Sequence, residues 1–158
     1  MNTTLAQHDF KHVDLTRYSG KWYVLACIPT RFDKSWSYVT ESYTLNKNGS
    51  IGIYTTYKKE TDPKERSVRS KGFPVKGTNN VLWKVQFVWP FKADYLIEEL
   101  ADDYTYVVVG HPKKKFLYVM NRGGKLNEIQ YNEILNRATK KGYDITKVHK
   151  VEQGFPSL

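Results

Sequence analysis

The chain is a succession of short segments with strand character, each closed by residues that favour turns. Aromatic and β-branched residues favour strands, whereas Gly, Asn, Asp and Pro end them. Eight such segments are expected, at residues 21–28, 38–45, 50–58, 66–75, 81–89, 94–100, 104–110 and 115–121. Because the connections are short, sequential neighbours should pair as antiparallel hairpins. Eight strands are enough to close an up-and-down sheet into a barrel with room for one small ligand.

Segment 81–89 has the clearest period of the chain. Its large apolar residues recur at every second position: Val81, Trp83, Val85, Phe87 and Trp89. This alternation predicts a strand with one buried face. A half-buried strand of a two-sheet sandwich has the same pattern, so periodicity alone leaves sandwich and barrel open.

The period changes after Arg122-Gly123-Gly124. Tyr131, Ile134, Leu135 and Ala138 follow helical spacing and predict an amphipathic helix over 126–141, ended by Gly142. Residues 143–149 then offer a short last strand. The predicted fold class is therefore all-β: an eight-stranded antiparallel up-and-down barrel with one C-terminal α-helix packed outside.

The 158 residues predict one domain, with a flexible lead-in at 1–12, a folded unit at 13–151 and a tail at 152–158. Cys27 is the only cysteine, which excludes an internal disulfide. The first residues lack the basic and apolar regions of a signal peptide. We therefore expect a cytoplasmic protein, or the mature form of a periplasmic or outer-membrane-associated one.

Basic residues outnumber acidic ones by 25 to 16, a formal net charge of +9. This excess favours anionic partners, although solubility alone explains it equally well. The basic residues are spread out, and clusters occur only at 58–59, 113–115 and 140–141. That pattern fits a charged rim better than a nucleic-acid groove, so no nucleic acid is expected. A basic module that binds an anionic membrane surface remains an alternative function.

The sequence lacks nucleotide-binding and hydrolase motifs, and no cofactor is expected. The histidines, His8, His12, His111 and His149, lack the spacing of a zinc site, so no metal is expected. The acidic cluster at 98–103 is interpreted as a turn. Cys27 supports one alternative, a barrel enzyme that acts on a lipid through a nucleophilic thiol. A buried, inert thiol is the favoured interpretation, and the protein is expected not to be an enzyme.

Gly20 and Trp22 suggest how one end of the barrel is closed. A glycine two residues before a tryptophan lets the backbone approach closely while the indole turns inward. Arg122 ends the eighth strand, which neighbours the first strand in a closed barrel. Its guanidinium should therefore lie near Trp22, where a cation over an indole stabilises by roughly 0.5–2 kcal/mol.

These residues resemble the motifs of the lipocalin family. Gly20-x-Trp22 is similar to the first motif, Asp102-Asp103-Tyr104 stands imperfectly where a Thr-Asp-Tyr motif belongs, and Arg122 is similar to the third. Further segments resemble the branch of bacterial lipocalins, plant temperature-induced lipocalins and apolipoprotein D. These segments are residues 17–23, 29–32, 89–91, 116–122 and 142–145.

The resemblance implies an eight-stranded calyx that binds, stores or transports a fatty acid or lysophospholipid without chemistry. Bacterial members are typically anchored to the outer membrane through an N-terminal cysteine, and no cysteine precedes Cys27 here. The branch also contains dimers, so the resemblance is compatible with a homodimer. Asp103 and Tyr104 are expected to be structural, like Gly20, Trp22 and Arg122.

The ligand-binding wall is predicted from strand parity. Its expected members are Ile53, Thr55, Val85, Phe87, Trp89, Tyr95, Ile97 and Tyr118. Each is also compatible with a plain core position. Trp36, on the first long loop, is predicted to be a lid, and Lys92 to meet an anionic headgroup. The alternative for Lys92 is a solvated loop lysine.

Overall fold

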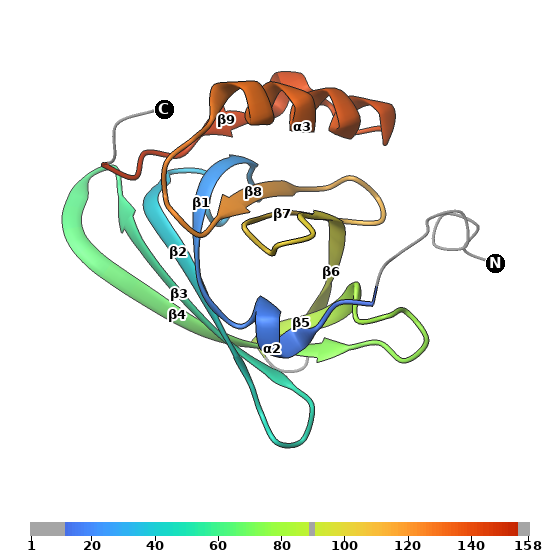
Figure 1. Cartoon of the computed structure of the whole chain (residues 1–158). Coiled ribbons are helices and arrows are strands. Elements are labelled where there is room, and N and C mark those ends of the chain that lie inside the picture. Colours follow the sequence, from blue (N-terminus) through green and yellow to red (C-terminus); the bar gives the residue numbers. More distant parts are fainter. Residues whose placement is uncertain (1–11, 89–90, 155–158) are drawn as a thin grey trace.

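The computed structural model describes residues 12–88 and 91–154 of the chain. A single sheet curls on itself, with the strand order β2-β3-β4-β5-β6-β7-β8-β1-β9. A further pairing of β1 with β2 closes it into a barrel (Figure 1). The predicted barrel is confirmed and the sandwich is excluded, because β1 joins the two ends of the eight-strand order.

The eight barrel strands lie within a few residues of the predicted segments. They are β1 (Gly20–Ile28), β2 (Trp36–Leu45), β3 (Ile51–Lys59), β4 (Asp62–Pro74), β5 (Leu82–Val88), β6 (Phe91–Leu100), β7 (Tyr106–Gly110) and β8 (Leu117–Asn121). All neighbouring pairs are antiparallel. Consecutive connections therefore alternate between the two ends of the barrel.

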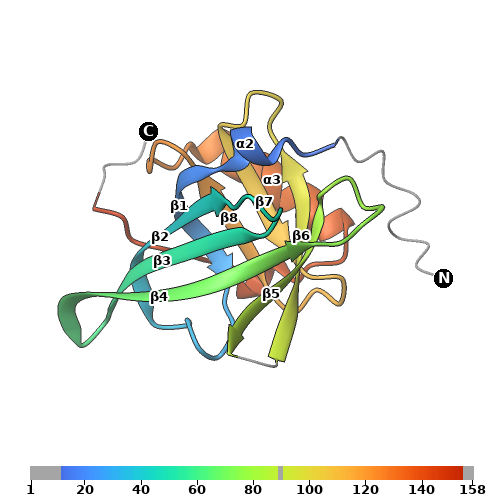
Figure 2. The same ribbon diagram turned by 90° about the horizontal axis from the view of Figure 1, so that it is seen from below.

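The two ends differ. Helix α2 (Leu15–Tyr18) crosses one end and places Tyr18 in the interior. This helix was not predicted; the Asp14 side chain caps it by accepting hydrogen bonds from the amides of Thr16 and Arg17. The connections 29–35, 60–61 and 111–116 belong to the opposite end, which we call the mouth. Figure 2 shows α2 and connection 29–35 at opposite ends.

Helix α3 (Glu128–Lys140) packs on the outer face of the barrel, as predicted (Figure 1). It begins after Asn127, whose side chain caps the amide of Gln130. Its buried face covers outward side chains of β1, β7 and β8, including Ala26, Val108 and Val119. These strands are therefore buried on both faces. No helix within 12–88 and 91–154 is long and apolar enough to cross a membrane.

The predicted last strand at 143–149 is wrong for most of its length. The Asp144 side chain accepts from the amide of Thr146 and starts a 3-10 turn, η1 (Ile145–Lys147). Only β9 (His149–Lys150) is extended, and it pairs with Ala26 and Cys27 of β1. β9 occupies the edge of β1 beyond Tyr23, because β2 pairs with β1 only as far as that residue.

Candidate ligand-binding site

An arginine clamp closes the end of the barrel that α2 crosses. Trp22 is fully buried, and its indole N–H donates to the Tyr18 carbonyl at 2.9 Å. The Arg122 guanidinium lies 3.7 Å from the Trp22 ring centroid. It also donates to the carbonyls of Lys21 at 3.0 Å and Arg17 at 2.8 Å. A side chain at Gly20 would crowd Arg122, because its Cβ would lie 3.2 Å from Nη1.

Asp103 and Tyr104 belong to the same end. Tyr104 has a φ of +60°, and its hydroxyl accepts from the amide of Asp14 at 2.9 Å. Arg17 lies over its ring at 4.1 Å. Asp103 accepts from the amide and hydroxyl of Thr105. The Tyr104 contacts tie the β6–β7 turn to the segment before β1. That Asp103 and Tyr104 are structural remains a prediction.

Aromatic side chains form the floor of the interior. The hydroxyls of Tyr18 and Tyr95 share a hydrogen bond of 2.5 Å, and Tyr95 donates to Tyr43 at 2.9 Å. Trp83 stacks on Tyr95 with centroids 4.4 Å apart. Burial raises the pKa of all three tyrosines, which keeps the hydroxyls protonated. Of the three tyrosines, only Tyr95 is predicted from the sequence to line the interior; alternation along β2 is the signal that indicates Tyr43.

Above this floor, strands β2 to β4 supply polar groups. Glu41 of β2 lies opposite Thr55 of β3, whose hydroxyl donates to Oε2 at 2.7 Å. Ser70 of β4 lies opposite the buried Ile53 and so shares its inward face. The Ser70 hydroxyl is buried and has no hydrogen-bond partner among the described residues. This wall can therefore bond a polar atom of a ligand.

Glu41 has an unusual charge state. Burial raises its pKa to about 8, and the nearby Asp33 carboxylate adds to the effect. The carboxyl group is therefore mostly neutral at pH 7. Its side chain is nevertheless partly accessible to water, as are those of Tyr57 and Tyr118, which also point inward. Water therefore reaches the interior at these three side chains.

The opposite wall is apolar. Val85, Ile97, Val109 and Met120, from β5 to β8, are all buried in the interior cluster. The interior consequently has two unlike sides, one hydrocarbon and one carrying a neutral carboxyl and hydroxyls. A ligand pocket of this kind holds an apolar body and orients it with few polar groups.

The mouth is partly covered by connection 29–35. Asp33 accepts from the amide of Thr30 at 2.8 Å and from the hydroxyl of Tyr118 on β8 at 2.5 Å. This contact holds the connection against the barrel. Trp36, at the start of β2, stacks on Tyr57 with centroids 3.6 Å apart. The indole therefore lies at the mouth, and its role as a lid remains a prediction.

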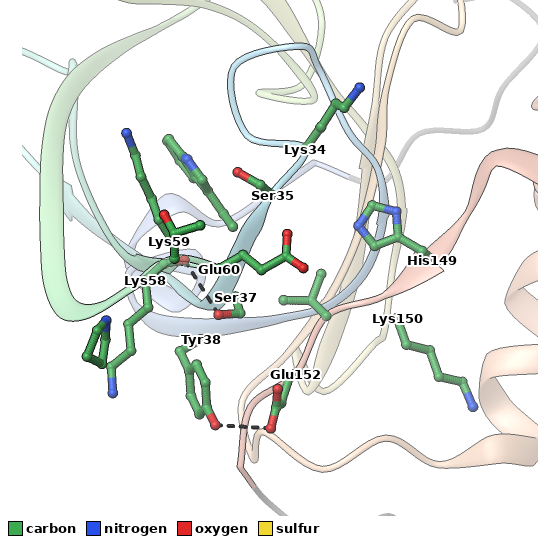
Figure 3. A pocket seen from close by; sticks show the side chains of 14 residues that line it. Lys34, Ser35, Ser37, Tyr38, Lys58, Lys59, Glu60, His149, Lys150 and Glu152 are labelled. Atoms are coloured by element: carbon green, nitrogen blue, oxygen red, sulfur yellow. Dashed lines mark hydrogen bonds between the residues drawn. The ribbon is translucent and has the colours of Figure 1, made fainter.

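Beside Trp36 lies a pocket of about 580 Å³. Figure 3 shows its walls: the start of β2, the β3–β4 turn and the segment around β9. Lys34, Lys58 and Lys59 bring positive charge to it, and Glu60 turns its carboxylate toward the centre (Figure 3). A group that carries both signs of charge is the chemistry that this pocket suits.

A catalytic thiol needs a base beside it, and for Cys27 the candidate base is His149. The Cys27 Sγ is 3.8 Å from Nε2 of His149. Burial, with a smaller effect of Asp33, raises the thiol pKa to about 12. The thiol is therefore protonated at neutral pH and is a weak nucleophile. No group of three metal-ligating side chains occurs within 12–88 and 91–154.

The predicted wall residues occupy different depths. Ile53, Thr55, Val85 and Ile97 are buried inside the barrel, whereas Phe87 is 58% exposed at the mouth. Tyr95 belongs to the floor and Tyr118 holds Asp33. Lys92 lies over the Phe73 ring, with Nζ 4.6 Å from its centroid. Its contact with a headgroup remains a prediction, and Trp89 lies outside the described residues.

A closed antiparallel barrel of eight strands with a partly polar interior defines a class of protein, the calyx-type binders of small apolar molecules. Residues 13–153 match the family model described as a lipocalin-like domain. The chain belongs to the lipocalin family. This confirms the resemblance in the sequence and, with it, a general capacity of the family to bind small hydrophobic ligands.

Two relatives show the branch. The chain is 29% identical to temperature-induced lipocalin-1 of Arabidopsis thaliana over 154 residues, covering 90% of this chain and 81% of the relative. It is 28% identical to the outer membrane lipoprotein Blc of Escherichia coli K12 over 141 residues, covering 89% and 79%. Lobster apocrustacyanin A1 has the same fold, with a TM-score of 0.70 at 20% identity, over 89% of this chain and 79% of that one.

Proposed function

We propose that the protein binds and carries one single-chain lipid, a fatty acid or a lysophospholipid, without changing it chemically. The acyl chain occupies the barrel interior and the headgroup stays at the mouth. The observation that carries this proposal is the separation of chemistry along the barrel. The interior is apolar on one side and on the other carries Glu41, whose carboxyl is mostly neutral at pH 7, while lysines gather around the pocket at the mouth.

The energetics favour a chain that enters tail first. Each buried methylene contributes about 0.8 kcal/mol, so ten contribute about 8 kcal/mol before the cost of association. A micromolar affinity needs about 8 kcal/mol net, so a longer chain or headgroup contacts must offset the cost of association. A carboxylate or phosphate that entered first would meet Glu41 and Asp33, whereas at the mouth it meets Lys34, Lys58 and Lys59.

Lipid extraction of the purified protein, followed by mass spectrometry, tests the proposal. We expect a fatty acid or lysophospholipid at up to one molecule per chain. A titration with lysophosphatidylcholine below its micelle concentration should then saturate at one site. Protein that carries no lipid and does not bind either ligand class would overturn the proposal.

Two variants of β5 locate the site. Val85 points into the barrel, whereas the neighbouring Gln86 points outward. Val85→Phe should fill part of the interior and lower the affinity about tenfold. Gln86→Phe adds the same ring outside and should bind as the parent does. Equal affinities of the two variants would place the ligand elsewhere.

A further inference from the structure

Three phenylalanines are exposed around the mouth. Phe32 is 79% exposed in connection 29–35, and Phe87 and Phe91 are 58% and 75% exposed on either side of the β5–β6 connection. Single exposed apolar residues are common and need no explanation. Here, however, three of the five large exposed hydrophobic residues of the described chain share one end of the barrel. The other two are Leu45, at the far end of β2 from the mouth, and Ile129, on α3 outside the barrel wall.

Basic side chains surround these rings. Arg31, Lys34, Lys59, Lys113 and Lys115 are exposed in the mouth connections or at their edges. Among the acids nearby, three have partners, and Glu60 turns into the pocket beside Trp36 (Figure 3). Asp33 is turned inward onto Tyr118, Asp62 pairs with Arg66 and Asp94 pairs with Lys84. The mouth therefore combines aromatic rings with an excess of positive charge.

We propose that the mouth docks onto an anionic lipid bilayer. The three phenylalanines enter the interface between headgroups and acyl chains, and the basic side chains contact the anionic headgroups. Charge complementarity decides the occupant. A second copy of this chain would bring one basic mouth against another, and like charges disfavour that contact. The proposal goes beyond lipid carriage, because docking requires no ligand in the barrel.

Flotation of the full chain with vesicles tests the docking surface. Phosphatidylglycerol vesicles should bind the protein, and phosphatidylcholine vesicles should bind it more weakly. Phe32→Ser and Phe91→Ser should each lower the partition coefficient about tenfold, because each removes a large apolar side chain from the interface. Ile129→Ser is the matched control: Ile129 is 75% exposed, like Phe91, but lies on α3, and this variant should bind as the parent does.

A second pair of variants tests the charge. Lys113→Glu at the mouth and Lys76→Glu in the connection 75–81 at the opposite end change the net charge equally. Only the first should weaken binding, and the difference should shrink at about 0.5 M salt. Ligand titrations of each variant should match the parent, so that a docking defect is distinguished from loss of the lipid site.

Three outcomes would overturn the proposal. One is equal vesicle binding by Phe32→Ser, Phe91→Ser and Ile129→Ser. Another is equal weakening by the two lysine variants, which would show attraction through net charge alone. The third is a parent protein that does not bind vesicles but forms a dimer, measured by light scattering, that dissociates in Phe32→Ser. The mouth would then be a contact between two copies.

Discussion

At the scale of single residues, Glu41 controls the charge of the interior. Its pKa in the folded protein, about 8, lies above the ordinary value of 4.5 because the carboxyl is buried. The folded state therefore holds this proton more tightly than the unfolded state. Glu41 favours folding fully below pH 4.5, and this contribution is lost as the pH rises through about 8.

The same proton should govern ligand binding. Above about pH 8 the ionised carboxylate would face the acyl chain, so the affinity for lysophosphatidylcholine should fall as the pH rises through that value. This ligand is suitable because its own charge is constant there. Glu41→Gln should bind with little dependence on pH in a fluorescence titration. Glu65→Gln, exposed on β4, is the control and should follow the parent; a pH-independent parent would contradict the prediction.

Arg122 is the second residue at which a substitution should change a measurable quantity, the free energy of unfolding. Its guanidinium donates to the carbonyls of Arg17 and Lys21 while it covers the Trp22 ring. Arg122→Ala removes these interactions and should lower the free energy of unfolding by about 2–3 kcal/mol. Arg122→Lys keeps the charge but loses the planar fork, so it should recover only part of this loss.

Urea denaturation measures the effect of Arg122. The control is Arg69→Ala, since Arg69 also lies over an aromatic ring, 4.4 Å from the centroid of Tyr54, but on the solvent face. That variant should cost less than about 1 kcal/mol. An equal loss in the two variants would show that the closed end gains nothing from the clamp.

At the scale of elements, the segment after β9 joins two strands that have separated. The Gln153 side-chain amide donates to the carbonyl of Val24 on β1 and to that of Val39 on β2, both at 2.7 Å. The backbone continues this bridge, because the amide of Tyr38 donates to the carbonyl of Glu152. Residues 152–154 therefore complete the barrel wall, although they were assigned to a tail from the sequence.

Removal of this bridge should weaken the barrel on that side. Gln153→Ala leaves two strand carbonyls without their donors, and we expect it to lower the free energy of unfolding by about 1–3 kcal/mol. Hydrogen exchange should quicken for amides near Val24 and Val39. Glu152→Gln keeps an acceptor for Tyr38 and serves as the control. Unchanged exchange in Gln153→Ala would mean that the strands hold their positions without the bridge.

At the scale of the whole molecule, a ligand in the interior should stabilise the entire barrel. A ligand that binds only the folded state at a hundred times its Kd adds about 2.7 kcal/mol to the free energy of unfolding. For a chain of this size the Tm should rise by roughly 5–10 °C. Differential scanning calorimetry with and without lysophosphatidylcholine measures the shift. Val85→Phe should show a much smaller one, and equal shifts would place the ligand outside the barrel.

The sequence by itself determined the eight hairpin-linked strands, the helix after them and the meeting of Trp22 with Arg122. Local patterns carry the strands and the helix, since period two or 3.6 and turn residues act over a few positions. The contact of Trp22 with Arg122 followed from the closed barrel, in which the eighth strand lies beside the first. Tertiary structure alone decided which side chains meet inside. The hydroxyls of Tyr43 and Tyr95 are 52 residues apart in sequence, and Asp33 and Tyr118 are 85 apart.

Depth along the barrel was also decided only in three dimensions. Val85 and Phe87 share one face of β5, yet Val85 is 5% exposed and Phe87 is 58% exposed. Alternation tells which face a residue occupies, but its height above the floor depends on how strands far apart in sequence are staggered when the barrel closes. For that reason the predicted wall divides into floor, interior and mouth, and Phe87 points to the membrane instead of the ligand in our proposal.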